Sequence, residues 1–347
     1  MQAITQLQIR NYKSIEQVDL SCSRINVLVG EPNVGKSNIL EALDLSFLSW
    51  IFSMNESFQK EGHRQIDLKD YFRVEKVADL YHLGNVARPI LISHPGFSYD
   101  VKVMLAKING KSIFEWTSGG QITAFDNDFV PVEGSHFYSS PIQPYRYSDN
   151  TELHDTGNYL DHLMPPFGNN WVKMLKWNPS FREFVNDLIQ DYGFELNIDS
   201  VSAKILIQFR VGKGLVYSVP YEAMADTLRR FIFYIAAIRH GNAPVITLEE
   251  PEVHSFPKYI SYLADEMIKA RRSQFFVATH SPYLLNNLVE NTPEGELAVF
   301  VCGYDKTRFE TTVKKLSPED LSELLNFGVD IFFNINRYVD DRSEHNP

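Results

Sequence analysis

The sequence has few cysteines and no long apolar run. Cys22 and Cys302 are its two cysteines, and their separation fits no spacing that is typical of a metal site. Two distant cysteines are typical of a reducing cytoplasm, without disulfide bonds. The longest apolar runs, such as residues 231–238, are too short to span a bilayer. Residues 1–5 have neither the basic nor the apolar region of a signal peptide, so we expect a cytoplasmic protein without a membrane anchor.

Basic charge, repeats and heptads are also scarce. The formal net charge of the 347 residues is −11, which argues against a protein that coats nucleic acid through bulk charge but leaves room for a local basic groove. Residues 159–192 have helical spacing without sustained heptads, so no long coiled-coil arm is expected. The chain also lacks a low-complexity tract and an internal repeat. Its length allows one large domain or two modest ones.

The most informative stretch that is present is residues 30–37, which read GEPNVGKS. It fits the phosphate-binding pattern G-x-x-x-x-G-K-[ST]. The apolar residues 25–29 before it predict a buried strand, and residues 38–43 after it predict the first turns of a helix. A strand, a glycine-rich turn and a helix is the arrangement that this motif needs. The alternative is an ordinary strand–turn–helix connection without a ligand.

This stretch predicts a bound nucleoside triphosphate. Glycines let backbone N–H groups approach phosphate oxygens, and the helix N-terminus adds a partial positive charge. Lys36 would reach the β- and γ-phosphates, and Ser37 would bind Mg²⁺. The candidate phosphate-binding residues are Gly30, Asn33, Gly35, Lys36, Ser37 and Asn38.

Upstream of this motif, residues 4–29 mix apolar and polar positions at strand-like spacing, and we expect three strands. Tyr12, Lys13 and Ser14 lie between the first two strands. Tyr12 fits a core or edge aromatic residue. The alternative is that Lys13 and Ser14 lie near the nucleotide, and both interpretations stay open.

The middle of the chain is expected to mix strands, loops and helices. A tight hairpin is predicted at residues 109–110 by the Asn-Gly pair. The aromatic and basic residues 145–147 could stack on a base or form a loop packed on the core. The other elements expected are a long helix over 38–54, strands over 89–92, 99–104, 112–116 and 135–138, helices within 159–192, and two or three strands over 194–218.

A second informative region follows a helix expected over residues 221–239. Residues 244–248 predict a short buried strand, which ends in Glu249 and Glu250. A carboxylate at the carboxyl end of a strand beside a P-loop can hold Mg²⁺, and a second one can polarise the attacking water. Glu249 stands where aspartate is commoner in such sites, and it keeps the charge. The alternative is a pair of surface glutamates.

A third strand end carries His280. Residues 273–278 predict another buried strand after a helix over 256–270, and Thr279, His280 and Ser281 follow it. A histidine at this place can hydrogen-bond the γ-phosphate or the attacking water. Most isolated histidines are structural, but the strand before His280 and the Ser-Pro pair after it favour a role in the site.

Together these segments resemble the ABC-type ATPases of the SMC, RecF and OLD group. The resemblance is carried by residues 30–37, 248–252 and 278–282, and by residues 9–15 at the first strand. It implies an α/β P-loop NTPase of the ABC-ATPase head type, with a mixed sheet, flanking helices and an inserted α/β lobe. The residues after 248 are most like those of OLD-type ATPases. We expect one head over residues 1–347, with a nucleotide-binding core at 1–54 and 200–316, an inserted lobe at 55–199, and a C-terminal helix and tail at 317–347.

The resemblance also implies a homodimer or higher homo-oligomer in which two heads enclose two ATP molecules. Residues 222–228 match the signature segment that would complete the partner's site, with Asp226 and Thr227 near its phosphate. The segment has no glycine where the family has one or two, which points to slow hydrolysis, and its alternative is a plain amphipathic helix. By the same carry-over, Lys36 and Ser37 bind phosphate and Mg²⁺, and Glu249 supports the metal. Glu250 is the catalytic base, His280 is the switch histidine, and Gln65 and Gln143 are candidates for a glutamine loop.

Three functions compete at this stage. The first is an ATPase switch for a separately encoded effector, in the setting of bacterial anti-phage defence, since the tail after His280 is too short for the TOPRIM nuclease domain of OLD nucleases. The second is a RecF-like clamp on DNA, with Arg229, Arg230 and residues 269–272 as possible contacts or as solvated helix faces. The third is a small-molecule kinase, which Glu249, Glu250 and His280 disfavour.

Overall fold

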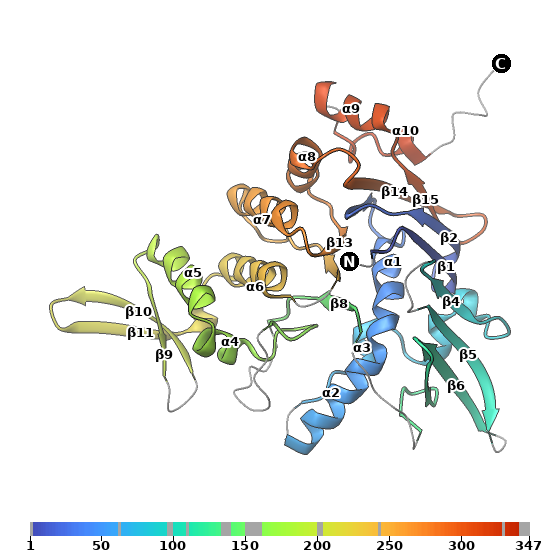
Figure 1. Ribbon diagram of the computed structural model, residues 1–347, viewed down its shortest axis with the longest axis horizontal. Helices are drawn as coiled ribbons and strands as arrows, with labels where there is room; N and C mark the ends of the chain where they lie inside the picture. Colours follow the sequence, from blue (N-terminus) through green and yellow to red (C-terminus); the bar gives the residue numbers. More distant parts are fainter. Residues whose placement is uncertain are drawn as a thin grey trace.

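The computed structural model describes residues 3–61, 64–95, 100–108, 111–132, 140–149, 162–199, 204–241, 244–327 and 330–339. Three sheets and their flanking helices lie side by side in Figure 1, with the three-stranded sheet far from the C-terminal helices. Within these ranges, no helix has both the length and the apolar character that crossing a membrane requires.

The central sheet has six strands and holds the P-loop strand in its middle. Its order is β15 (Glu310–Lys315), β14 (Leu297–Asp305), β3 (Ile25–Gly30), β13 (Gln274–Ala278), β12 (Val245–Glu249) and β8 (Ile142–Tyr145). All neighbouring pairs from β14 to β8 are parallel, and β15 is antiparallel to β14. The loops that follow β3, β12, β13 and β8 therefore meet at one edge, where parallel sheets bind ligands. The predicted mixed sheet with flanking helices is confirmed.

Residues of β3 alternate between two apolar cores because successive side chains of a strand point to opposite faces. Val27 and Val29 belong to the core formed with α6 (Asp226–His240), α7 (Pro257–Lys269) and α8 (Pro282–Asn291). Leu28 belongs to the core formed with α1 (Lys36–Asp44), α2 (Leu48–Glu61) and the N-terminal sheet. The sheet is thus covered on both faces, as parallel sheets require.

The N-terminal sheet is antiparallel throughout. Its order is β2 (Ile15–Ser21), β1 (Gln6–Tyr12), β4 (Ile90–Ser93), β5 (Val101–Ile108), β6 (Lys111–Ser118) and β7 (Gln121–Phe125). The three strands expected between residues 4 and 29 and those near 90, 101 and 112 are confirmed. Ile108 pairs with Lys111 across β5 and β6. The predicted turn at 109–110 and strand at 135–138 lie outside the described residues.

A third, three-stranded sheet has the order β11 (Leu215–Pro220), β10 (Ile205–Gly212) and β9 (Glu195–Ile198), as predicted for residues 194–218. It projects beside α5 (Pro179–Gln190) in Figure 1. The remaining helices are α3 (Leu68–Phe72), α4 (Trp171–Trp177), α9 (Pro318–Phe327) and α10 (Asn336–Val339), with short 3₁₀ turns at η1 (Leu45–Phe47), η2 (Val77–Leu80), η3 (His82–Gly84) and η4 (Tyr221–Ala223).

Two expectations need correction. The predicted helix over 38–54 is interrupted, because η1 separates α1 from α2. The indole Nε1 of Trp116 donates to the Leu45 carbonyl oxygen at 2.9 Å, so this carbonyl has a partner outside the helix. Tyr145 does not lie in a loop: it ends the buried strand β8, and its hydroxyl donates to the Leu163 carbonyl at 2.8 Å. β8 also shows that part of the segment 55–199 belongs to the central sheet.

Candidate nucleotide site

The P-loop connects β3 to α1 in the conformation that its sequence allows. Asn33 and Gly35 have positive φ angles of 63° and 98°, a region that asparagine and glycine tolerate. A Cβ atom at Gly35 would lie 2.0 Å from the Thr311 hydroxyl oxygen, so only glycine fits there. Lys36 begins α1, and its ammonium group donates to the carbonyl oxygens of Gly30 at 2.9 Å and Glu31 at 2.8 Å.

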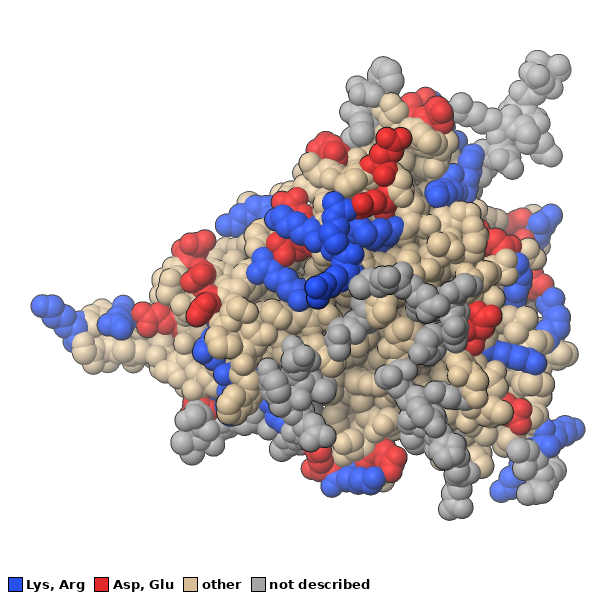
Figure 2. All heavy atoms as spheres, viewed as in Figure 1, with Lys and Arg blue, Asp and Glu red and all other residues tan. Residues whose placement is uncertain are grey.

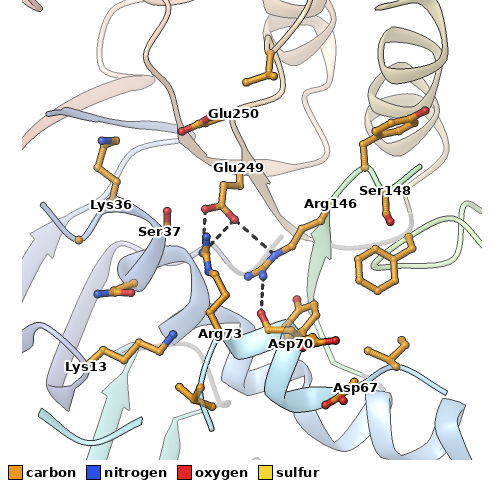
Figure 3. Close-up of a pocket in the computed structure, with 18 of the residues that line it drawn as sticks. Lys13, Lys36, Ser37, Asp67, Asp70, Arg73, Arg146, Ser148, Glu249 and Glu250 are labelled. Carbon is orange, nitrogen blue, oxygen red and sulfur yellow. Dashed lines mark hydrogen bonds and ion pairs between the residues drawn. The ribbon is translucent and has the colours of Figure 1, made fainter. Parts of the chain in front are cut away.

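The P-loop borders a cleft of about 1220 Å³. Figure 3 shows Lys36 and Ser37 on one side of it and Glu249 and Glu250 at the ends of neighbouring elements. Most of the predicted site residues line this cleft: Lys13, Ser14, Asn33, Gly35, Lys36, Ser37, Asn38, Glu249, Glu250 and His280. The parallel order of β3, β13 and β12 explains why residues more than two hundred positions apart meet here.

Glu249 lies at the carboxyl end of β12 and faces Ser37. Both side chains line the cleft, so a carboxylate and a hydroxyl oxygen lie together next to the P-loop. Burial raises the pKa of Glu249, but Arg146, Arg73 and Ser37 outweigh it and lower the pKa below its usual value. Glu249 is therefore ionised at neutral pH. Oxygen ligands of this kind suit Mg²⁺.

Glu250 and His280 form a second pair at the same edge. The Glu250 carboxylate lies 3.3 Å from Nε2 of His280. Burial and the charge of Lys36 lower the pKa of His280, while Glu250 opposes them. The backbone of Glu250 has a positive φ of 44°, and its N–H donates to the Ala278 carbonyl at 2.9 Å, which ties the turn after β12 to β13. A neutral imidazole beside a carboxylate can accept or pass on a proton.

Lys36 is buried beside Cys302, Glu249 and Glu250. Burial lowers its pKa, while Cys302, Glu250 and Glu249 raise it. Its donors point at the carbonyls of its own loop, so a bound phosphate would take over these hydrogen bonds. The site thus combines a cation, two carboxylates and an imidazole within one cleft.

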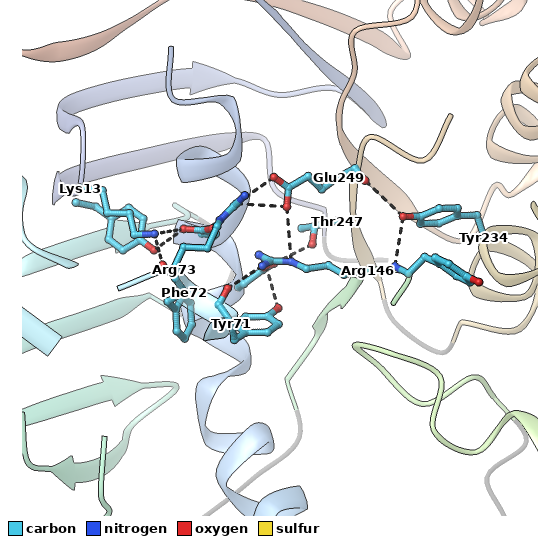
Figure 4. Close-up of polar contacts among 12 residues, drawn as sticks. Lys13, Tyr71, Phe72, Arg73, Arg146, Tyr234, Thr247 and Glu249 are labelled. Atoms are coloured by element: carbon cyan, nitrogen blue, oxygen red, sulfur yellow. Dashed lines mark hydrogen bonds and ion pairs between the residues drawn. The ribbon is translucent and has the colours of Figure 1, made fainter. Parts of the chain in front are cut away.

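Two arginines that sequence reasoning missed hold Glu249. Figure 4 shows Arg73 and Arg146 approaching it from different elements. Nη2 of Arg73, in the turn after α3, lies 3.0 Å from the Glu249 carboxylate, and Nε of Arg146, at the end of β8, lies 3.9 Å from it. No motif marks these arginines. The aromatic–basic composition of residues 145–147 was the one available signal.

Each arginine also pairs with a fully buried carboxylate of α1. Arg73 bonds to Glu41, which also accepts from Lys13. Arg146 donates to Asp44 at 2.6 Å, and Asp44 also accepts from Thr247 at 2.8 Å and Tyr71 at 3.1 Å. Burial raises the pKa of Asp44, although Arg146 and the two hydroxyls oppose this. The charged floor of the cleft is thus built from α1, α3, β8 and β12 together.

Comparison with known proteins assigns this geometry to a class. Residues 3–161 match the family described as "AAA ATPase domain", and residues 128–286 match the family described as "AAA domain, putative AbiEii toxin, Type IV TA system". No curated protein sequence gives a significant match. The two family matches overlap, and together they extend from the first strand to α8.

One solved structure supports the fold, and two others are reported beside it. A crystal structure of an SMC head bound to the C-winged helix domain of ScpA aligns with a TM-score of 0.51 and 15% identity, covering 91% of this chain and 98% of that chain. The SMC head of Thermotoga maritima aligns with a TM-score of 0.42 and 14% identity over 90% and 98%. An SMC head with an extended coiled coil, derived from Pyrococcus furiosus, aligns with a TM-score of 0.48 and 13% identity over 93% and 98%.

The chain is a P-loop ATPase with the fold of an SMC head. The predicted resemblance to the SMC and ABC type is confirmed, whereas the narrower resemblance to OLD enzymes stays a prediction. The family matches imply that the ATPase binds nucleotide.

In this ATPase, Tyr12 is buried in the core, as one interpretation of residues 12–14 had it. Lys13 and Ser14 line the cleft, and their proximity to a nucleotide stays a prediction. Ser14 accepts a hydrogen bond from Asn38 at 2.7 Å and lies 2.6 Å from the Thr311 hydroxyl. Burial lowers the pKa of Lys13, which nevertheless bonds to Glu41.

Asp226 and Thr227 lie at the start of α6 and do not line the cleft of their own ATPase. Asp226 accepts from Arg230 at 2.7 Å and lies 3.0 Å from Nδ1 of His254. Burial would raise the pKa of Asp226, but these two partners lower it to about 2. The hydroxyl of Thr227 donates to the His254 carbonyl. Their predicted role in a partner's site stays a prediction.

The two glutamine candidates occupy different places. Gln65 is exposed, lines the cleft and donates to the Asn55 carbonyl at 3.3 Å. Gln143 is buried within β8, opposite Ile246, and accepts from the Tyr145 hydroxyl at 3.1 Å. From the end of β8, Arg146 is among the residues that line the cleft, whereas Gln143 is not.

Proposed function

We propose that two copies of this ATPase close around two Mg·ATP molecules and act as a switch for a separately encoded effector protein. The observation that carries the proposal is the meeting of two pairs in one cleft. Ser37 and Glu249 line the cleft together, and Glu250 lies 3.3 Å from His280. The first pair fits a magnesium ion, and the second fits activation of water.

The residues around the cleft fit ATP with Mg²⁺. Ser37 and Glu249 supply oxygen ligands, and backbone N–H groups of residues 33–37 and the ammonium of Lys36 suit the phosphates. A bound Mg²⁺ supplies positive charge that neutralises the phosphate oxygens. Glu250 would accept a proton from the attacking water, and His280 would hydrogen-bond the water or the γ-phosphate.

The placement of α6 supports a dimer. Asp226 and Thr227 lie outside their own cleft, so any contact they make with a phosphate must be with that of a second copy. In the dimer, Thr227 and the first N–H groups of α6 would face the partner's ATP, and Asp226 would hold Arg230 and His254 beside them. The signature segment has no glycine, so we propose slow turnover.

One comparison supports a protein partner, and another supports the setting. The SMC head that aligns with this chain is bound to a domain of ScpA. The family over residues 128–286 is described as "AAA domain, putative AbiEii toxin, Type IV TA system". We therefore propose that ATP-driven closure is passed to another protein, in the setting of bacterial anti-phage defence.

A test uses Glu250→Gln, which removes the proposed base and keeps the side-chain volume. With Mg·ATP, this variant should form a dimer that persists, while phosphate release falls by about a hundredfold or more. Light scattering and a phosphate-release assay measure the two effects. Glu319→Gln, an exposed position on α9, serves as the control for the same charge change. Normal hydrolysis by Glu250→Gln would remove Glu250 from its role.

A DNA clamp is the second candidate, because Figure 2 shows basic side chains gathered on the face where α7 ends. The Glu296 carboxylate pairs with Arg24 and Arg271, and Glu266 pairs with Arg239 and Lys269. Arg272 adds a further exposed cation. Stimulation of ATP hydrolysis by duplex DNA, with binding that weakens steeply with salt, would favour this candidate over the switch.

A further inference from the structure

Glu252 is a buried carboxylate for which the proposed mechanism has no use. It lies in the turn after β12, two residues beyond Glu250, and only 7% of its surface is exposed. Its Oε1 accepts hydrogen bonds from the Thr279 hydroxyl at 2.5 Å and from the backbone N–H of His280 at 2.9 Å. Glu252 therefore binds the two residues that follow β13.

These contacts fix the backbone that carries the imidazole. The Thr279 hydroxyl also accepts from the backbone N–H of Ser281 at 3.0 Å, so residues 279–281 are held by one side chain and its neighbour. The imidazole of His280 is itself 35% exposed, and Glu250 is the carboxylate beside it. Because so much of the ring faces the cleft, its direction depends on how the backbone beneath it is held.

The anchoring runs in both directions between the two turns. The backbone N–H of Glu250 donates to the Ala278 carbonyl at 2.9 Å, so β13 also holds the turn after β12. Glu250 and His280 thus face each other from turns that are joined by three hydrogen bonds. A change in one bond would alter the distance between carboxylate and imidazole.

Packing alone does not account for a glutamate at this position. Oε2 of Glu252 is buried and has no hydrogen-bond partner among the described residues. Burial raises the pKa of Glu252, with Glu250 adding to this effect and Thr279 and His280 opposing it. Leaving a buried polar atom unpaired is unfavourable. The two hydrogen bonds through Oε1 must therefore offset the cost of burying Oε2.

We propose that Glu252 is a positioning residue, which holds the backbone of His280 so that the imidazole stays beside Glu250 and above the phosphate end of the cleft. This inference rests on the proposed function, because it assigns Glu252 a role through His280. It predicts that kcat depends on an acceptor oxygen at residue 252 and does not depend on the negative charge of that residue.

Three single variants and one double variant test this. Glu252→Ala should lower kcat for ATP by about tenfold to a hundredfold, because it releases His280, and KM should stay within about threefold since neither residue holds the P-loop. Glu252→Gln keeps an acceptor oxygen at the same place and should retain kcat within about threefold. Glu252→Ala combined with His280→Ala should be no more than about twofold slower than His280→Ala alone.

The control is Glu266→Ala, which removes another buried glutamate, on α7, outside the cleft. It should leave kcat unchanged. If Glu252→Ala does not fold, Thr279→Val removes one of the two donors with little change in volume and should lower kcat in the same direction. Multiplying losses in the double variant, or a glutamine variant as slow as the alanine variant, would overturn the proposal.

Failure of the proposed function would look different. In that case His280→Ala and Glu250→Gln would both hydrolyse ATP at the normal rate, whatever the Glu252 variants do. If these two variants are slow while Glu252→Ala is normal, the proposed function stands and the role of Glu252 is rejected.

Discussion

The nucleotide cleft and the hairpin of β10 and β11 place charge and apolar surface in opposite ways. Beneath the cleft, the side chains of Glu41 and Asp44 on α1 are 0% exposed. In the hairpin, Val211 is 61% exposed and Leu215 is 59% exposed, while β11 is an edge strand. A protein tolerates a buried charge only when that charge is paired. Substituting an apolar side chain that is already exposed changes the free energy of unfolding little. The two regions should therefore respond very differently to substitution.

The largest effect is expected from Arg146→Met, which leaves Asp44 buried without its cation. Breaking such a pair costs about 3 kcal/mol of unfolding free energy, because the remaining charge is uncompensated. Urea denaturation measures this. Adding Asp44→Asn to the same chain should recover most of the loss, since both charges are then gone. If the single variant is as stable as the wild type, the cleft does not depend on its buried pairs.

A smaller effect is expected from Lys36→Ala on nucleotide affinity. Loss of charge-assisted hydrogen bonds to phosphate should weaken ATP binding by about 2 kcal/mol. Calorimetric titration with Mg·ATP measures this. The melting temperature without nucleotide should change little, because the partners of the Lys36 ammonium among the described residues are carbonyls of its own loop. Retained affinity would remove the P-loop from the nucleotide site.

The smallest effect is expected in the hairpin. Val211→Thr and Val216→Thr should each change the unfolding free energy by less than about 0.5 kcal/mol, because both side chains already face water. Val27→Thr in β3 makes the same chemical change at a fully buried position and should cost about 1–3 kcal/mol. Similar losses at all three valines would contradict the contrast between cleft and hairpin.

The parts of the cleft that could be predicted are those in which the site residue directly follows a recognisable strand in the sequence. The P-loop, Glu249 and His280 each follow a short apolar strand, and this pattern alone is enough to place them at one edge of a parallel sheet. Strands β1, β2, β4, β5 and β6 of the N-terminal sheet were found in the same way, from alternating apolar positions and turn residues, whereas β7 was not predicted.

What escaped sequence analysis depends on contacts between distant segments. Arg73 and Glu249 are 176 positions apart, and nothing in the local sequence of either indicates the other. The sequence of β8 is IQPY, and its glutamine and proline are not typical of a buried strand, although all four residues are buried. The interruption between α1 and α2 involves Trp116, which lies on β6. Such features are set by tertiary packing, which periodicity does not report.

The position of β3 has a consequence for how the protein is made. Its neighbours in the sheet are β13 and β14, so the strand leading into the P-loop is flanked on both sides by residues 274–305. During translation, the strands of the N-terminal sheet can pair with one another early. β3 can pair with β13 and β14 only after almost the whole chain has left the ribosome. We therefore expect the P-loop of an unfinished polypeptide to reach its final position only after the C-terminal strands have been synthesised.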